Sequence, residues 1–181
     1  MDDRSLPYSA AMDALAGPYL ASALLLVVAG AAKVRDPLPL VRALRSARLP
    51  TPVTAVRLVA VAELALGLVA VLLGGRLTAV LVAVSYAAFT ALVLLARARG
   101  GVLASCGCFG RADTPPTAGH VVVTASLALL AAGMATAPLG TLAQVLASGP
   151  GAGLPLVLAA VTVAVLVHGV LALLPALQAA R

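Results

Sequence analysis

Long apolar runs separated by short polar segments divide the chain of 181 residues. A helix needs roughly 20 apolar residues to cross a hydrocarbon core of about 30 Å. Runs close to that length predict five membrane-spanning helices, at about 14–32, 53–73, 77–96, 117–137 and 154–174. The pattern therefore predicts an all-α integral membrane helical bundle, with a four-helix core and a fifth transmembrane helix.

The polar segments between these runs define the expected domain organisation. Residues 1–13 form a short polar tail that lacks the basic region of a signal peptide, so the first run is expected to remain as a membrane helix. Residues 14–137 hold the four-helix membrane domain. An uncharged linker rich in Pro, Gly, Ser and Ala follows at 138–153, and residues 154–181 hold the fifth helix and the C-terminal tail.

One short segment, at about 38–49, has an amphipathic pattern. At 100° per residue, Arg42, Arg45 and Arg48 project to one side and apolar residues to the other. Such a helix is typical of the headgroup plane, with its arginines directed to anionic lipid. Lys33, at the end of the first run, is expected to be a headgroup anchor on the same membrane surface.

Composition and charge agree with a membrane protein and give it an orientation. The chain is 62% hydrophobic and 10% charged, whereas soluble domains carry about 25% charge. The net charge of +6 does not indicate nucleic-acid binding, because the cations lie between apolar runs and only 3% of residues are aromatic.

The side expected to be cytoplasmic carries nine cations against two on the other. The nine are Lys33, Arg35, Arg42, Arg45, Arg48, Arg97, Arg99, Arg111 and Arg181, and the two are Arg4 and Arg76. This bias predicts a multi-pass protein of the cell (plasma) membrane, with its N-terminus outside and the 97–117 loop in the cytoplasm.

That loop holds the only two cysteines, Cys106 and Cys108. Their one-residue spacing would allow a small, strained disulfide, and Gly107 makes the required backbone angles accessible. A strained, exposed disulfide is easily reduced, so the pair suits thiol exchange. The plainer interpretation is two small residues at a membrane interface. A metal site with His120 and Asp113 would depart from the usual zinc spacing, so no metal is expected.

Glu63 lies in the middle of the second apolar run. An acid at mid-bilayer costs about 2.5–3.5 kcal/mol on insertion scales and needs a partner inside the bundle. Glu63 lies 12 residues before Gly75 and Tyr86 lies 11 after it, so a hairpin turn at Gly75 puts both at one depth. With His168 of the last run they could form a buried polar cluster. This cluster would be either a proton- or quinone-binding site or a hydrogen-bonded clip that holds the helices together.

Four sequence elements occur in the order of a known family. They are Gly30-Ala-Ala-Lys-Val-Arg-Asp-Pro37, Glu63-Leu-Ala-Leu-Gly67, Phe89-Thr90 and Cys106-Gly-Cys-Phe-Gly110. In this order they resemble the methylamine utilisation protein MauE family, within the wider DoxX-like group of membrane proteins. The resemblance covers about residues 15–137.

The resemblance implies a thiol-redox accessory that helps to mature methylamine dehydrogenase, a secreted enzyme rich in disulfides. Cys106 and Cys108 would exchange with a thioredoxin-like partner, acting as a thiol–disulfide oxidoreductase-like accessory, and Gly107, Phe109 and Gly110 would shape the approach. No cofactor is evident, although a quinone is suggested by analogy with membrane thiol oxidoreductases. The implied role requires thiols outside the cell, whereas the charge bias directs this loop inward. The alternative is a small membrane transporter or permease-like subunit that uses the Glu63 cluster and has structural cysteines.

Overall fold

The structure of the chain is a computed structural model. It describes residues 6–46, 49–98, 117–136, 139–147 and 153–179. These residues form helices and no strand, which confirms the all-α prediction. The helices are α1 (Leu6–Arg35), α2 (Leu38–Ser46), α3 (Val53–Leu72), α4 (Arg76–Ala98), α5 (Ala118–Met134), α6 (Leu142–Ala147) and α7 (Gly153–Ala179).

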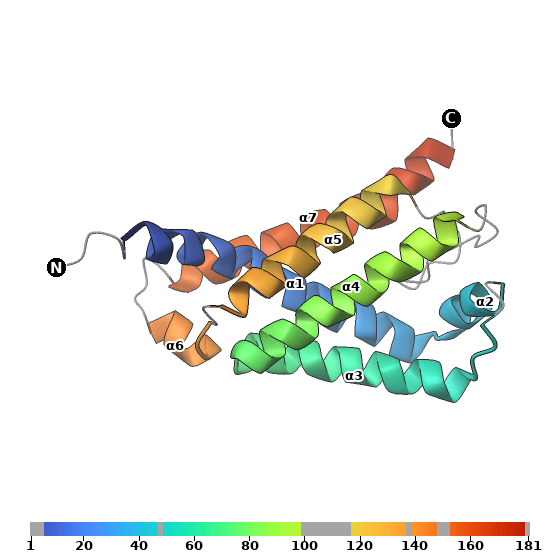
Figure 1. Cartoon of the computed structure of the whole chain (residues 1–181), viewed down its shortest axis with the longest axis horizontal. Coiled ribbons are helices and arrows are strands. Elements are labelled where there is room, and N and C mark those ends of the chain that lie inside the picture. Colours follow the sequence, from blue (N-terminus) through green and yellow to red (C-terminus); the bar gives the residue numbers. More distant parts are fainter. Residues whose placement is uncertain (1–5, 47–48, 99–116, 137–138, 148–152, 180–181) are drawn as a thin grey trace.

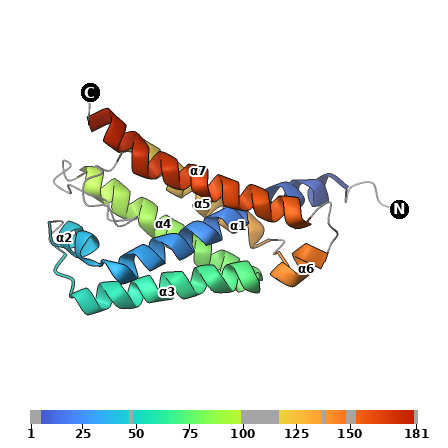
Figure 2. The same ribbon diagram turned by 180° about the vertical axis from the view of Figure 1, so that it is seen from behind.

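The five long helices lie along one axis and alternate in direction (Figure 1). Helices α1, α4 and α7 run one way, and α3 and α5 run back. Helix α1 is central, because it packs against α3, α5 and α7, while α4 closes the set against α3 and α5. The view from behind shows α7 alongside α1 (Figure 2). The arrangement is the predicted four-helix core with a fifth helix added on the α1 side.

The contact between α1 and α3 is close because glycine lies on both sides of it. A Cβ atom added at Gly30 would come within 2.6 Å of the Leu64 backbone nitrogen. One added at Gly67 would come within 2.8 Å of the Ala23 carbonyl oxygen. Small residues at membrane helix interfaces allow such backbone approach, so these glycines set the distance between the two helices.

The outward faces of the helices are apolar. Leu129 on α5 is 74% exposed, and Leu58 on α3 is 72% exposed. Three helical segments are long and apolar enough to cross a membrane, namely Leu15–Arg35, Val53–Leu72 and Arg76–Ala98, and two shorter apolar stretches accompany them at Ala118–Met134 and Leu154–Gly169. The exposed apolar side chains suit contact with lipid, so this chain is a helical membrane protein. The number of five crossings stays a prediction.

Two segments depart from the sequence-based expectation. Helix α1 begins at Leu6, within the segment expected to be a tail, and α6 occupies part of the expected linker. A reciprocal cap begins α6: the Thr141 amide donates to Gln144 Oε1 (2.8 Å), and the Gln144 amide donates to Thr141 Oγ1 (3.2 Å). This capping box is a recognisable helix-start pattern that an assignment from composition overlooks.

The turn between α3 and α4 is built on two glycines with positive φ, Gly74 at 60° and Gly75 at 97°. The Gly75 amide donates to the carbonyl oxygen of Leu139 (3.0 Å), which ties this turn to the residues before α6. The expected antiparallel hairpin is therefore present, and the segment after α5 supports it.

Helix α2 lies across the opposite end of the bundle from α6 (Figure 1). Its buried side includes Pro39 and Val41, whereas Arg42 and Arg45 are exposed. It packs against α3, and Ala43 contacts Ala96 near the end of α4. We call this end of the molecule the α2 end; it also holds the last turns of α1 and α4 and the first turns of α3 and α5.

Candidate functional site

A buried ion pair joins α1 to α3. The Lys33 ammonium group donates a hydrogen bond to Glu63 Oε2, and both side chains are buried. Lys33 lies in the last turn of α1, but a helical side chain points back toward the N-terminus of its helix. Since α1 runs toward the α2 end, this direction carries the Lys33 ammonium inward, to the depth of Glu63.

Two aromatic rings of α4 complete the surroundings of the ammonium group. Lys33 Nζ lies over the Phe89 ring, 4.5 Å from its centroid. Phe89 meets Tyr86 edge to face, with centroids 5.7 Å apart and an interplanar angle of 88°. The Tyr86 hydroxyl donates to the Ser22 carbonyl oxygen (2.6 Å), which anchors α4 on α1. Residues of α1, α3 and α4 therefore meet at one charged centre, which we call the Lys33–Glu63 centre.

This geometry corrects the expected role of Lys33. The sequence interpretation made it a headgroup anchor, but it is only 2% exposed and its ammonium group lies between helices, against Glu63 and Phe89. Glu63 provides the reason, because a buried carboxylate is stabilised by a cation at hydrogen-bond distance and by further polarisable contacts. Lys33 is the only lysine of the chain. Because an acid in the middle of a membrane span needs a cation, the sequence held a signal for Lys33 as the partner of Glu63.

A second set of polar contacts, which we call the hydroxyl seam, joins α4 to α5 through Thr90 and Thr124. The Thr90 hydroxyl donates to Thr124 Oγ1 (2.9 Å), and the Thr124 hydroxyl donates to the His120 carbonyl oxygen (2.8 Å). At the start of α5, the Thr117 amide donates to His120 Nδ1 (3.3 Å), and the Thr117 hydroxyl lies 2.8 Å from the same nitrogen. The Thr90–Thr124 bond joins α4 to α5, and the other bonds lie within the start of α5, where the chain returns from the 99–116 segment.

The predicted site residues fall into three groups. Glu63 and Tyr86 both belong to the Lys33–Glu63 centre, although the Tyr86 hydroxyl bonds to α1 and not to Glu63. His168 is half-buried on α7, which packs chiefly against α1 and not α3. The membrane-surface residues Arg42 and Arg45 are exposed on α2. The remaining predicted residues lie outside the described part of the chain; they are Arg48, Cys106, Gly107, Cys108, Phe109 and Gly110.

Within the described ranges, no group of three or more His, Cys, Asp or Glu side chains could hold a metal ion. His120 is buried and its Nδ1 atom is engaged by Thr117. The arrangement offers instead a buried ion pair, an aromatic support for its ammonium group and hydrogen-bonded threonines between α4 and α5.

Comparison with known families decides the affiliation. The family model of the methylamine utilisation protein MauE matches residues 12–138, well over half of the chain. The chain belongs to the MauE family. Searches of curated proteins and of solved structures returned no match.

The MauE match runs from α1 to α5 and contains the Lys33–Glu63 centre, the hydroxyl seam and both cysteines. Helices α6 and α7 follow it. The protein is thus a membrane protein of a family that serves methylamine utilisation, and its matched part corresponds to the four-helix core.

Proposed function

We propose that this MauE protein is a thiol-redox accessory of the plasma membrane that assists disulfide formation during maturation of a partner such as methylamine dehydrogenase. The observation that carries the proposal is the Cys106-Gly107-Cys108-Phe109-Gly110 stretch inside the region matched by the family. The hydroxyl seam adds support, because it holds the two helices on either side of that stretch at one end of the bundle.

The proposed chemistry is a balanced exchange between two proteins. A thiolate of a thioredoxin-like partner attacks one sulfur of the Cys106–Cys108 disulfide, forms a mixed disulfide and releases the other sulfur as thiolate. The second partner thiolate then attacks the mixed disulfide. The partner leaves oxidised, and Cys106 and Cys108 receive two electrons and two protons. A quinone of the bilayer is the class of oxidant that the analogy offers for restoring the disulfide.

Thiol labelling in intact cells tests the proposal. A membrane-impermeant maleimide should label Cys106 and Cys108 after reduction and should fail to label them after oxidation, with the Cys106→Ser/Cys108→Ser variant as the blank. Labelling without prior permeabilisation would place the thiols outside, and labelling only after permeabilisation would place them in the cytoplasm, as the charge bias predicts. Thiols that stay inert in every redox state would refute the proposed role.

A second function is favoured by one observation, the charged pair between membrane-spanning helices. A small membrane transporter or permease-like subunit could use Glu63 as its charged group. Under that function, Lys33→Met/Glu63→Leu, which removes both charges together, abolishes transport and leaves thiol exchange intact. The Cys106→Ser/Cys108→Ser variant would show the reverse, so the two variants separate the two functions.

A further inference from the structure

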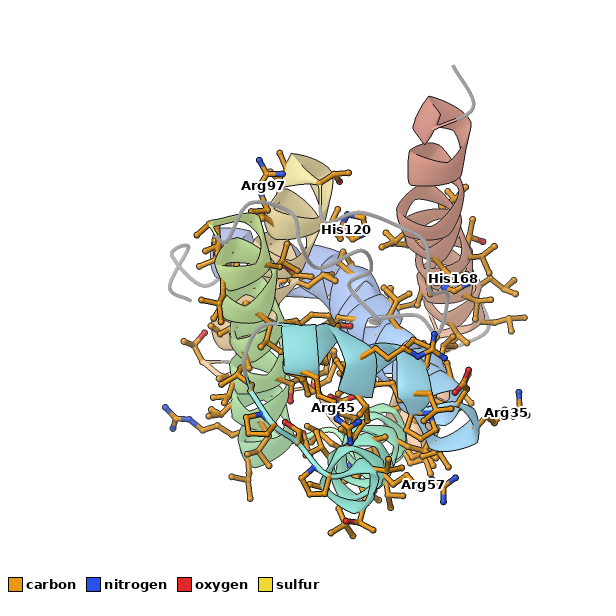
Figure 3. The ribbon with its side chains drawn as sticks, turned by 90° about the vertical axis from the view of Figure 1, so that its right-hand side faces the viewer. Arg35, Arg45, Arg57, Arg97, His120 and His168 are labelled. Carbon is orange, nitrogen blue, oxygen red and sulfur yellow. The ribbon has the colours of Figure 1, made fainter. Side chains whose placement is uncertain are left out.

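Exposed arginines gather at the α2 end of the molecule. We call them the arginine rim; they are Arg35, Arg42, Arg45, Arg57 and Arg97. Figure 3 looks onto this end and shows Arg35, Arg57 and Arg97 directed outward from the bundle, with Arg45 beside α2. The rim therefore draws on the consecutive segment from the end of α1 through α2 to the start of α3, and on the end of α4, which is distant in the sequence.

The rim has a large excess of positive charge. Among the described residues at this end, Asp36 is the exposed acid, and its carboxylate accepts a hydrogen bond from the Leu38 amide (3.1 Å). Glu63 is buried and already paired with Lys33. At the other end of the bundle, Arg76 is the exposed cation within the described ranges. The asymmetry is thus a property of the folded surface as well as of the sequence.

The apolar neighbours of these arginines match a lipid interface. Leu38 at the start of α2 is 47% exposed, and Leu49 after its end is 40% exposed. Between them, α2 buries Val41 against the bundle and exposes Arg42 and Arg45. Arginines beside exposed leucines, at the end of a lipid-facing bundle, are typical of a helix in the headgroup plane.

We propose that the arginine rim, centred on Arg42 and Arg45 of α2, is a binding site for anionic phospholipid headgroups. The guanidinium fork matches phosphate in two parallel hydrogen bonds, and the adjacent leucines would contact the acyl chains of the same lipid. Single-stranded nucleic acid, the other common polyanion, is disfavoured because it binds by stacking its bases on aromatic side chains, and only 3% of the chain is aromatic. The inference is independent of the proposed thiol chemistry.

Lipid titration of the purified full-length protein tests the site. Native mass spectrometry in a neutral detergent would count bound phosphatidylglycerol, with phosphatidylcholine as the uncharged comparison. Arg42→Gln/Arg45→Gln should weaken phosphatidylglycerol binding by roughly thirty-fold, since each arginine near an anionic headgroup contributes about fivefold. Arg42→Lys/Arg45→Lys keeps both charges but loses the guanidinium fork, so its affinity should lie between those of the wild type and of Arg42→Gln/Arg45→Gln. Arg76→Gln, the matched change at the other end, should leave it unchanged.

Three outcomes would overturn the proposal. In the first, wild type and Arg42→Gln/Arg45→Gln bind phosphatidylglycerol equally. In the second, the wild type binds phosphatidylcholine as tightly as phosphatidylglycerol. In the third, excess inorganic phosphate displaces the lipid, which would indicate a site for the phosphate ion. Circular dichroism checks that the double variant keeps its helices. If it does not fold, Arg42→Gln and Arg45→Gln are measured singly, with a loss of about fivefold expected for each.

Discussion

Lys33 on α1 and Glu63 on α3 form a buried ion pair, although 30 residues separate them in the sequence. The Phe89 ring of α4 lies beneath the ammonium group, 4.5 Å from it. The pair therefore links three helices at one point. Its two charges are stable in this apolar surrounding only because each compensates the other.

Removing one member of the pair should destabilise the protein strongly. Lys33→Met leaves the Glu63 carboxylate without its cation, and we expect a loss of about 3–5 kcal/mol in the free energy of unfolding. The double change Lys33→Met/Glu63→Leu should recover most of that loss. Unfolding in mixed detergent, followed by circular dichroism, measures both effects. The neighbouring exposed Arg35→Gln is the control, and equal losses from Arg35→Gln and Lys33→Met would contradict the prediction.

The close approach of α1 and α3 should make Gly30 intolerant of any side chain. In Gly30→Ala the new methyl group would meet backbone atoms of Leu64 (2.6 Å) and Ala60 (2.9 Å), which cannot move aside as a side chain can. We expect a loss of about 1–3 kcal/mol, typical of overpacking. Gly169→Ala on α7 is a matched control, because nothing lies within 4 Å of its added Cβ. Thermal unfolding should show Gly169→Ala unchanged or slightly more stable, and a similarly harmless Gly30→Ala would refute the close contact.

The two turn glycines should differ in sensitivity. Gly75→Ala meets only backbone strain from its positive φ, which costs about 1–2 kcal/mol. Gly74→Ala has the same strain, and its methyl group would also collide with the carbonyl oxygens of Leu139 and Gly140. The loss should therefore be clearly greater for Gly74→Ala in the same unfolding measurement. The reverse order would mean that the 139–140 segment does not pack on this turn.

The hydroxyl seam between α4 and α5 should show a measurable coupling energy. A double-mutant cycle with Thr90→Val and Thr124→Val isolates the bond between the two hydroxyls from the bonds that each makes to its own helix. Interhelical hydrogen bonds in membranes average about 0.6 kcal/mol and reach about 1.7 kcal/mol, so a coupling in that range is expected. Thr162→Val, at an exposed threonine of α7 that bonds only to Leu158 of its own turn, should show no coupling with Thr90→Val.

Much of the fold follows from the sequence. Run lengths predict the long helices, Gly74-Gly75 predicts the hairpin between α3 and α4, and the alternation of α2 predicts its exposed arginine side. A lone acid inside an apolar run also predicts a buried partner, because a carboxylate without one is too costly in lipid. These features depend on local composition and on distances along one helix, which the sequence specifies directly.

The identity of that partner was decided by the tertiary structure. In a soluble protein, the apolar stripe of a helix shows which face is buried. Helices α1, α3 and α5 are apolar on every side, so their sequences carry little information about which face meets which neighbour. Glycine contacts such as Gly30 against Leu64 fix how each helix is rotated about its own axis. This rotation brings Lys33 to Glu63 and places Phe89 beneath the ammonium group, whereas His168 lies on α7. Sequence alone therefore determined that this is a helical membrane protein with a buried charge, and only close packing of backbones decided what neutralises that charge.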